Sequence, residues 1–373
     1  MRITEVTTVK QAKEFIKVQH KLYKNDQHWI SPLDQDVQEV FDEKENPFFK
    51  NGEAKRWLLL NKRGKLIGRV AAFYNGKSVD KTGQRTGGMG FFECINNKEA
   101  AYLLFDTCKK WLKSKNITAM DGPVNFGEKD RFWGLMVQGF KNPSYLENYN
   151  PPYYQNFFEG YGFEKLFEQS TSEITLQDFN FERFNKLASR VLNNPVYSFE
   201  HYRDNHIDKF AADFVSIYNQ AWASRPDFVP MTMERVMTTL KSLRPILKED
   251  LIWFAYANNE PAGFYINTID VNQIFKHLKG KMNLWAKLKF LWYRKFGRVD
   301  RARGIVFGVI PKYQNLGLET GMIMKLYEAI MKYKHLQASE LSWIGDFNPK
   351  MHSLFQALGA KTTKVHYTYQ CKF

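Results

Sequence analysis

The sequence predicts an α/β (α+β) fold with two tandem domains of the same design. Its 373 residues suffice for two domains of ordinary size. Apolar residues make up 44% of the chain and aromatic residues 16%, which is enough to fill two packed cores. Short apolar strands alternate with amphipathic helices, and their order in the first half of the chain recurs in the second.

The first half is expected to begin with a helix and a hairpin. Thr8 and Gln11 form a capping box at the start of a helix. A turn at 61–64 joins two apolar strands as a hairpin. The full expected series is helix 8–23, a short helix within 28–50, strands 56–60, 66–74 and 90–95, helix 97–115, strand 118–121, helix 151–162 and strand 163–175.

The second half repeats the order of helix, hairpin, strand, long helix, strand, helix and strand. Its expected elements are helices 207–223 and 231–246, strands 251–257, 262–268 and 304–309, helix 317–334, strand 340–345, helix 349–358 and strand 364–372.

A shared sequence feature supports a duplication. In each half an Asn-Pro pair opens a helix, a Phe follows within it, and a Gly stands four residues after the Phe. The matching residues are Asn150, Pro151, Phe158 and Gly162 in the first half and Asn348, Pro349, Phe355 and Gly359 in the second. We therefore expect domains at 1–180 and 181–373, connected by a linker near 176–206.

Positive charge is concentrated in one segment. Lys and Arg outnumber Asp and Glu by 54 to 39, a formal net charge of +15. Residues 1–180 carry only +3, whereas 271–304, expected as an insert in the second domain, hold ten basic residues and one acidic residue. This balance excludes an acidic disordered chain and favours an anionic partner.

The insert reads as a basic amphipathic helix, which Gly280 can break into two helices. Its apolar residues recur on one helical face: Ile274, Leu278, Met282, Trp285, Leu288, Trp292 and Phe296. The opposite face carries Lys276, Lys279, Lys287 and Arg294. Such a helix fits an anionic membrane surface or an acyl chain, and it equally fits a stripe packed on its own domain. Nucleic acid is the less favoured partner, because no recognised nucleic-acid-binding module accompanies the insert.

The three cysteines, Cys94, Cys108 and Cys371, form no CxxC pair. They predict free, mostly buried thiols and no metal site. The first residues lack the apolar core of a signal peptide, and no apolar run of about 18 residues occurs. We expect a cytoplasmic protein, which the basic insert can attach peripherally to a membrane.

The clearest local signal is a turn between strand 304–309 and helix 317–334. The strand ends at Val309, and the polar residues Gln314 and Asn315 precede Gly317. Such a junction presents unpaired backbone N–H groups at the positive end of the helix dipole, where anions bind. A plain strand-to-helix turn, with Gly317 for backbone geometry alone, is the alternative reading.

This stretch resembles the Q/R-x-x-G-x-G/A motif of the GCN5-related N-acetyltransferases, the GNAT superfamily. That family uses the motif to hold the pyrophosphate of acetyl-coenzyme A through backbone amides. The segments GPVNF, GLMVQGF and NYNPPYY further resemble a group of bacterial tandem GNAT-like proteins. The resemblance implies two tandem GNAT-like domains, each a mixed, mainly antiparallel sheet flanked by helices. It also implies acetyl-CoA or another acyl-CoA as co-substrate, without a metal. The implied cofactor contacts are Val309, Gln314, Asn315, Leu316, Gly317, Leu318, Glu319, Thr320 and Phe355.

The sequence departs from this family at two kinds of position. Glu319 stands where the family has Gly or Ala, and a carboxylate near a pyrophosphate costs about 4 kcal/mol at an effective dielectric of 20. Phe355 and Phe158 stand where the family often has a Tyr that protonates the leaving thiolate. The first copy has Asn96 and Asn97 in place of the motif. We therefore expect only the second copy to bind coenzyme A in the family manner.

The resemblance implies Asn348 near the thioester, and Asp346 follows a strand end as an acid–base candidate, with Glu340 and His352 as further candidates. A polar and aromatic set in the first copy reads either as a pocket for a small-molecule or peptide amine or as an interface between the copies. Its members are Asn125, Glu128, Asp130, Arg131, Trp133, Asn148, Tyr149, Tyr153 and Tyr154.

The function that these residues and the resemblance imply is acyl-CoA-dependent N-acyl transfer to an amine. Two other functions stay open. One is a catalytically degenerate GNAT scaffold that binds an anionic surface or partner. The other is a Fem-like aminoacyltransferase, since tandem GNAT-like folds also occur among enzymes that use aminoacyl-tRNA.

Overall fold

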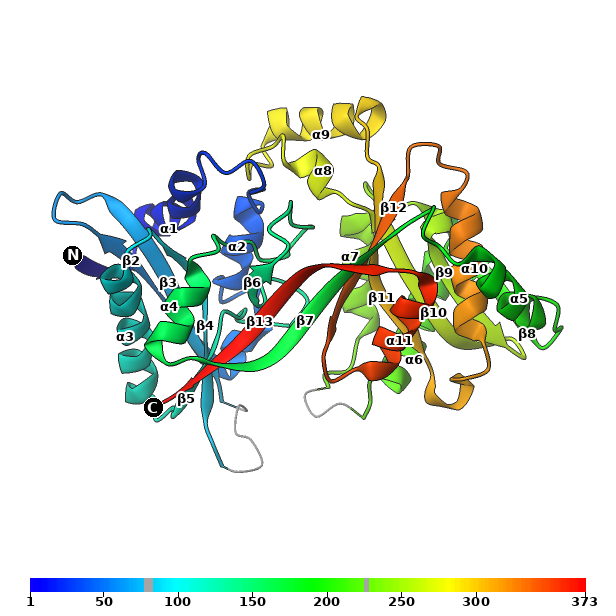
Figure 1. Cartoon of the computed structure of the whole chain (residues 1–373), viewed down its shortest axis with the longest axis horizontal. Helices are drawn as coiled ribbons and strands as arrows, with labels where there is room; N and C mark the ends of the chain where they lie inside the picture. The colour runs from blue at the N-terminus through cyan, green and yellow to red at the C-terminus, as the bar shows by residue number, and fades with distance from the viewer. Residues whose placement is uncertain (77–82, 225–227) are drawn as a thin grey trace.

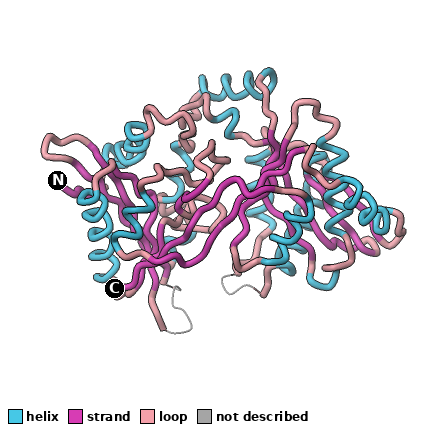
Figure 2. Tube along the Cα trace, in the orientation of Figure 1, coloured by secondary structure: helices cyan, strands magenta, loops and turns pink. Residues whose placement is uncertain are grey.

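A computed structural model of the chain describes residues 1–76, 83–224 and 228–373. These residues form two lobes, one from each half of the chain, and a 13-stranded sheet runs continuously through both (Figures 1 and 2). The sheet is mixed and mainly antiparallel, and helices flank it. The expected fold class is therefore confirmed.

The first lobe holds most of the chain up to residue 161. Its elements are β1 (Arg2–Glu5), α1 (Val9–Leu22), α2 (Asp34–Val40), a 3-10 turn (Pro47–Lys50), β2 (Gly52–Leu60), β3 (Leu66–Asn75), β4 (Thr86–Cys94), α3 (Lys98–Ser114), β5 (Ala119–Gly122), β6 (Leu135–Gln138) and α4 (Tyr154–Tyr161). Strand β7 (Glu164–Thr175) then crosses toward the second lobe (Figure 1).

The second lobe repeats this order with an extra first helix and an inserted pair of helices, and its described residues hold no counterpart of β6. Its elements are α5 (Phe181–Leu192), β8 (Tyr197–His201), α6 (Ile207–Ala221), α7 (Met233–Leu243), β9 (Ile252–Ala257), β10 (Glu260–Ile269), α8 (Asn272–Phe275), α9 (Leu284–Phe296), β11 (Arg301–Val309), α10 (Leu318–Ile330), β12 (Ala338–Gly345), α11 (Pro349–Leu358) and β13 (Lys361–Lys372). Short 3-10 turns lie at 204–206, 249–251 and 311–313. Helices α8 and α9 are the insertion, between β10 and β11.

The last strand of each half completes the sheet of the other lobe. Strand β7 pairs with β12 of the second lobe, from Ala338 opposite Thr175 to Gly345 opposite Gln169. Strand β13 pairs with β5 and β6 of the first lobe. The two crossing strands also pair with each other along most of their length, as the diagonal band in Figure 1 shows. This exchange joins the lobes through backbone hydrogen bonds as well as side chains.

Local signals in the sequence explain where several helices begin and end. The Thr8 side chain accepts from the Gln11 N–H, and the predicted capping box is present. Gly162 and Gly359 end α4 and α11 in the left-handed region, at φ of 103° and 92°. The duplicated Phe–Gly spacing therefore corresponds to the same helix ending in both copies.

Sequence reasoning missed four elements, and two of them correct the expected linker. Residues 176–206 contain α5 and the edge strand β8, so this stretch is part of the fold. Strands β1 and β6 were also not expected, since each has only four residues. Helix α4 begins at Tyr154, three residues later than predicted, after a turn that contains Pro151.

All three cysteines are buried free thiols, as predicted. No helix in the described ranges is both long enough and apolar enough to cross a membrane.

Candidate active site

A small cavity lies where the two lobes meet. It encloses about 20 Å³. Its walls come from the loops after β5 and β6 and from strands β7, β11, β12 and β13. The lining residues are Lys129, Asp130, Arg131, Phe132, Trp133, Leu146, Glu147, Gln169, Thr171, Arg303, Glu340, Ser342, Trp343 and His366. We call it the junction cavity.

A parting of two parallel strands leads to the junction cavity. Strands β11 and β12 pair only from Arg301 to Arg303, opposite Ala338 to Glu340. Beyond this point β11 runs on to Val309 and β12 to Gly345 without pairing to each other. Arg303 and Glu340, the last paired residues, both line the junction cavity. The Ser342 hydroxyl of β12 bridges the start of the parting, where it donates to the carbonyls of Gly304 and Ile305 on β11. Beyond this bridge the facing backbone edges can receive an extended ligand.

The predicted anion-binding turn lies at the far end of this parting. Gly317 is the N-cap residue of α10, at φ 87°. Because it is a glycine, it has no side chain that could cap the helix. Asn315 is also left-handed, at φ 64°, and Gln314 Nε2 donates to the Val309 carbonyl over 3.1 Å. Gln314, Asn315 and Leu316 are exposed. The turn thus presents backbone groups to solvent at the positive end of a helix dipole.

Glu319 occupies part of this helix end. Burial raises the pKa of its carboxyl, while hydrogen bonds from the N–H groups of Glu319 and Asn315 act in the opposite direction. The same carboxylate therefore uses two of the donors that an anionic ligand would need. Thr320 donates to the Gly317 carbonyl over 2.7 Å and stabilises the first helical turn.

His366 brings an imidazole to the junction cavity from β13. Its Nε2 lies 3.0 Å from the Asn148 carbonyl oxygen, which can only accept, so Nε2 carries the proton in the neutral ring. Burial lowers the pKa of His366, which keeps the ring neutral near pH 7. Its Nδ1 then holds a lone pair, the form that a general base requires.

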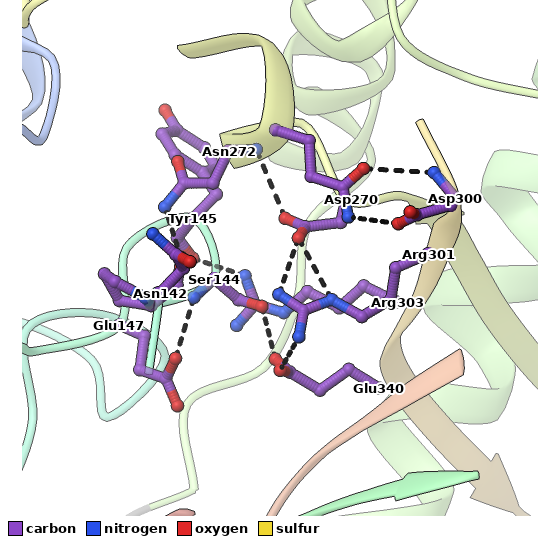
Figure 3. Close-up of polar contacts among 12 residues, drawn as sticks. Asn142, Ser144, Tyr145, Glu147, Asp270, Asn272, Asp300, Arg301, Arg303 and Glu340 are labelled. Atoms are coloured by element: carbon purple, nitrogen blue, oxygen red, sulfur yellow. Dashed lines mark hydrogen bonds and ion pairs between the residues drawn. The ribbon is translucent and has the colours of Figure 1, made fainter. Parts of the chain in front are cut away.

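Glu340 cannot serve in that way, because two cations contact it, and Figure 3 shows one of them, Arg301. Its carboxylate lies 2.8 Å from Lys364 Nζ and 3.2 Å from Arg301 Nη1, and Ser144 donates to it as well. Burial alone would raise the pKa of Glu340, but Lys364 and Arg301 outweigh it and hold this pKa far below its ordinary value. A carboxylate that stays ionised at all working pH values is a poor proton acceptor.

The two predicted catalytic residues bind backbone instead of lining a cavity. Asp346 is exposed and accepts from the Glu168 N–H over 3.2 Å. The Asn348 side chain caps α11 through the Met351 N–H. His352 lies 3.2 Å from the Gly345 carbonyl, and Phe355 packs against the second-lobe core. Neither of the two cavities described here is lined by any of these four residues.

The predicted acceptor residues separate into two groups. Arg131 and Trp133 line the junction cavity, and Trp133 Nε1 donates to Thr368 of β13 over 2.9 Å. Glu128 lies 3.9 Å from Arg235 of α7, and Asn125 donates to the Glu128 carbonyl. The loop over 125–133 therefore forms part of the interface between the lobes and also a wall of the cavity.

Tyr153 and Tyr154 make the second group. Their hydroxyls bind the carbonyl and the N–H of Cys94 at the end of β4, over 2.9 and 2.7 Å. Tyr154 also lines a different, larger cavity within the first lobe. These two tyrosines therefore act on the first copy's own strand and do not meet Arg131 or Trp133 around one cavity.

Comparisons with known proteins agree with the architecture. No family model matches the chain. A tandem GNAT protein from the clavulanic acid biosynthesis pathway superposes with a TM-score of 0.57 at 12% identity, over 100% of this chain and 98% of that one. A GCN5-related N-acetyltransferase from Sphaerobacter thermophilus gives 0.53 at 10% identity, over 99% and 95%. The chain has a tandem GNAT fold.

Two curated proteins are similar along almost their whole length. Protein YghO of Escherichia coli K12 is 26% identical over 366 residues, 96% of this chain and 92% of that protein. The bacterial ceramide synthase of Caulobacter vibrioides is 26% identical over 384 aligned residues, 99% of this chain and 97% of that protein.

The first GNAT copy closes the gap that the second leaves open. Strands β4 and β5 also part after a short paired stretch, Thr86 to Gly88. Here the chain after β5 fills the space: the Val124 N–H donates to the Met89 carbonyl, and a Cβ on Gly90 would stand 1.9 Å from the Val124 oxygen. The Asn97 side chain caps α3. The first copy thus has neither the open strand edges nor the uncapped helix end.

The larger cavity, of about 60 Å³, holds a buried ion pair that sequence reasoning missed. Glu93 on β4 accepts from Tyr23 over 2.7 Å, from Tyr154 over 3.0 Å and from Arg69 over 3.4 Å. Burial raises the pKa of Glu93, and Arg69 and both tyrosines offset this only in part. Gln19 of α1 completes the group by accepting from Arg69. We call this set the Glu93 network.

A signal for this network was present in the sequence. Arg69 and Glu93 interrupt the otherwise apolar strands IGRVAAF and GFFECI, at positions that face a core. In the second copy the corresponding pair in register is Phe264 opposite Gly308, with Trp222 packed over Gly308. The same place in the GNAT fold is therefore polar in one copy and aromatic in the other.

Proposed function

We propose that the protein is an acyl-CoA-dependent N-acyltransferase whose acyl donor binds the second copy. The observation that carries the proposal is the parting of β11 and β12. It runs from the helix end at Gly317, where the N-cap residue has no side chain, to a cavity lined by the neutral imidazole of His366. The blocked equivalent in the first copy supports the assignment to the second.

In this proposal the donor lies along the parted strands. The turn at 314–320 holds its pyrophosphate, and the edge of β11 receives the pantetheine arm through backbone hydrogen bonds. Ile305, 44% exposed on the parted part of β11, supplies apolar surface for an acyl chain. Phe347, 66% exposed just after β12, adds apolar surface where it packs on Phe167 of β7. The thioester then reaches the junction cavity.

The proposed chemistry needs one proton acceptor. The amine nitrogen attacks the thioester carbonyl carbon, His366 Nδ1 takes the proton from nitrogen, and the C–S bond breaks to release coenzyme A. The proton on His366 leaves with the thiolate or to water, so charge and atoms balance. Asp346 and Asn348 each accept a hydrogen bond from a backbone N–H group. We therefore propose that they support the structure around the site and do not take part in the proton transfer.

The acceptor class we propose is a primary amine on a lipid. Similarity to the bacterial ceramide synthase supports this class, because a ceramide is the amide of a long-chain amino alcohol. The apolar residues that border the parted strands support it as well.

One observation favours a second candidate, a GNAT scaffold without catalysis. The Glu319 carboxylate competes with pyrophosphate for the N–H groups of the turn. If the carboxylate excludes pyrophosphate, the protein binds no acyl donor, but it can still bind a partner through the surface of the GNAT fold.

Calorimetry with acetyl-CoA and palmitoyl-CoA separates the two candidates. We expect binding to the wild type, and at least about tenfold tighter binding to Glu319→Ala, since a competing carboxylate is removed. Glu99→Ala is the matched control, because Glu99 holds the same position in the first turn of α3 and its change should leave affinity unaltered. No binding to either the wild type or Glu319→Ala would overturn the donor site.

The catalytic step is tested by mass spectrometry of the product formed from palmitoyl-CoA and a long-chain amino alcohol. We expect His366→Gln to bind the donor as tightly as the wild type does, with kcat about 100-fold lower. The increase in rate toward higher pH that a general base produces should also be absent in this variant. Equal rates for wild type and variant would remove His366 from the mechanism.

A further inference from the structure

Helix α9 presents most of its apolar residues to solvent. Only Ala286 and Phe290 are buried, and Tyr293 is half-buried. The exposed apolar side chains are Leu284, Trp285, Leu288, Leu291, Trp292 and Phe296, which are between 50% and 74% exposed. Single exposed apolar residues are ordinary, but six on one helix of a folded domain are not.

These side chains form one face that points away from the protein. With about 3.6 residues per turn, Ala286, Phe290 and Tyr293 form a narrow stripe, and the six exposed residues lie on the opposite side. The stripe fixes the helix, because Phe290 packs on Phe275 and Tyr293 stacks on His277 with ring centroids 3.9 Å apart. The outward face is thus held in place and not left to a loose segment.

This arrangement corrects the sequence expectation for the insert. The apolar residues over 274–296 were expected on one helical face, with Gly280 as the point where the helix can break in two. The break is present, but the two parts have different surroundings: Ile274 and Leu278 are buried in the second-lobe core, while Trp285, Leu288, Trp292 and Phe296 are exposed. The half of the stripe that packs on its own protein ends before α9 begins.

Basic residues border the outward face. On the helical wheel Lys287 and Arg294 lie on one flank, Lys289 lies on the other, and Lys295 lies within the apolar sector. All four are exposed, and α9 contains no acidic residue. Long basic side chains flanking Trp, Leu and Phe are the composition of helices that lie in the headgroup region of anionic membranes.

We propose that α9 docks the protein on the surface of an anionic lipid bilayer. The outward apolar face enters the headgroup region, and the flanking Lys and Arg side chains bind lipid phosphates. Figure 1 shows α9 at the upper edge of the molecule, where a flat surface can reach it.

Docking there would bring the bilayer close to the proposed site. The insert contacts the loop over 143–147, because Asn272 donates to the Pro143 carbonyl and Phe275 packs on Tyr145. Leu146 and Glu147 of this loop line the junction cavity. Delivery of a lipid amine rests on the proposed function, whereas docking itself does not.

Vesicle flotation tests the docking with the full chain. Vesicles of phosphatidylcholine alone are compared with vesicles of phosphatidylcholine and phosphatidylglycerol in equal parts, at low and high salt. We expect binding to the anionic vesicles that salt weakens, and at least about tenfold weaker binding for Trp285→Ser/Trp292→Ser and for Lys287→Gln/Lys289→Gln/Arg294→Gln. Val9→Ser/Lys13→Gln, on the exposed face of α1, is the control that should bind as the wild type does.

Three results would overturn the proposal. The first is equal binding to neutral and anionic vesicles. The second is a dimer in light scattering that does not bind vesicles and that Trp285→Ser/Trp292→Ser dissociates. In that case a second copy of the chain covers the outward face of α9. The third is binding to a DNA duplex and not to vesicles. If the wild type binds anionic vesicles but shows no acyltransferase activity, only the proposed function is rejected and the docking proposal stands.

Discussion

Lys364 carries its charge where water hardly reaches, with a side chain only 1% exposed. It lies between Glu147 of the first lobe and Glu340 of the second, and both carboxylates are nearly buried. Arg301 adds a second cation that also binds Asp270 over 2.7 Å. The lobes thus meet through a buried charge cluster in which each member depends on the others.

Replacing Lys364 with Met should therefore destabilise the protein by about 3–5 kcal/mol, because two buried carboxylates lose their shared partner. Urea unfolding at pH 7 measures the change. Lys361→Met is the control on the same strand, since Lys361 is 71% exposed and its pair with Asp178 is worth at most about 1 kcal/mol. Similar losses for both variants would mean that burial of the cluster does not matter.

Asp36 gives a pH-dependent prediction. Burial raises the pKa of its carboxyl to about 6. Because this folded pKa exceeds the unfolded one, the native state binds the proton more tightly, and ionisation weakens the fold as pH rises from about 4 to beyond 6. Asp36→Asn removes that penalty, so its stability relative to wild type should grow by about 2 kcal/mol between pH 4 and 7.

Urea titrations at several pH values between 4 and 7 provide the measurement. Asp42→Asn, at an exposed position of the same region, is the control and should track the wild type. A constant difference between Asp36→Asn and wild type across this range would contradict the prediction.

At the scale of elements, strongly periodic segments were predictable and tertiary partners were not. Helix α1 and the turn before α10 follow from local signals such as Thr8 and Gly317. Helix α5 also has a buried stripe at Phe184, Ala188 and Val191, but its residues were predicted to be part of a linker. The insert shows the limit most clearly, since one apolar pattern in the sequence serves two environments in the fold.

The candidate site was predictable only in its donor half. The turn at 314–320 has a sequence motif, whereas the junction cavity exists because the strand exchange brings His366 of β13 beside Trp133 of the first lobe. No local pattern marks that meeting. Arg69 and Glu93 could have been noticed as charges in core-facing strand positions, but their partners Tyr23 and Tyr154 come from distant segments.

At the scale of the whole molecule, the exchange of β7 and β13 decides whether the halves can exist apart. A boundary near residue 180, as the duplication suggests, leaves 1–180 without the strand that covers β5 and β6. It also leaves 181–373 without β7, the neighbour of β12. Each fragment would expose an unpaired sheet edge, and 181–373 would also expose a charge cluster that lacks Glu147.

We therefore expect 1–180 and 181–373 to be unfolded or aggregated when each is produced alone, and to form a soluble complex when co-expressed. Size-exclusion chromatography and circular dichroism measure both states. A fragment of 1–180 that carries residues 361–373 at its end, through a flexible linker, should recover part of the first lobe, because β13 again pairs with β5. A cooperative thermal transition for either bare fragment would contradict this expectation. It would mean that each GNAT copy is held by its own core and that the crossing strands only fix how the two copies sit together.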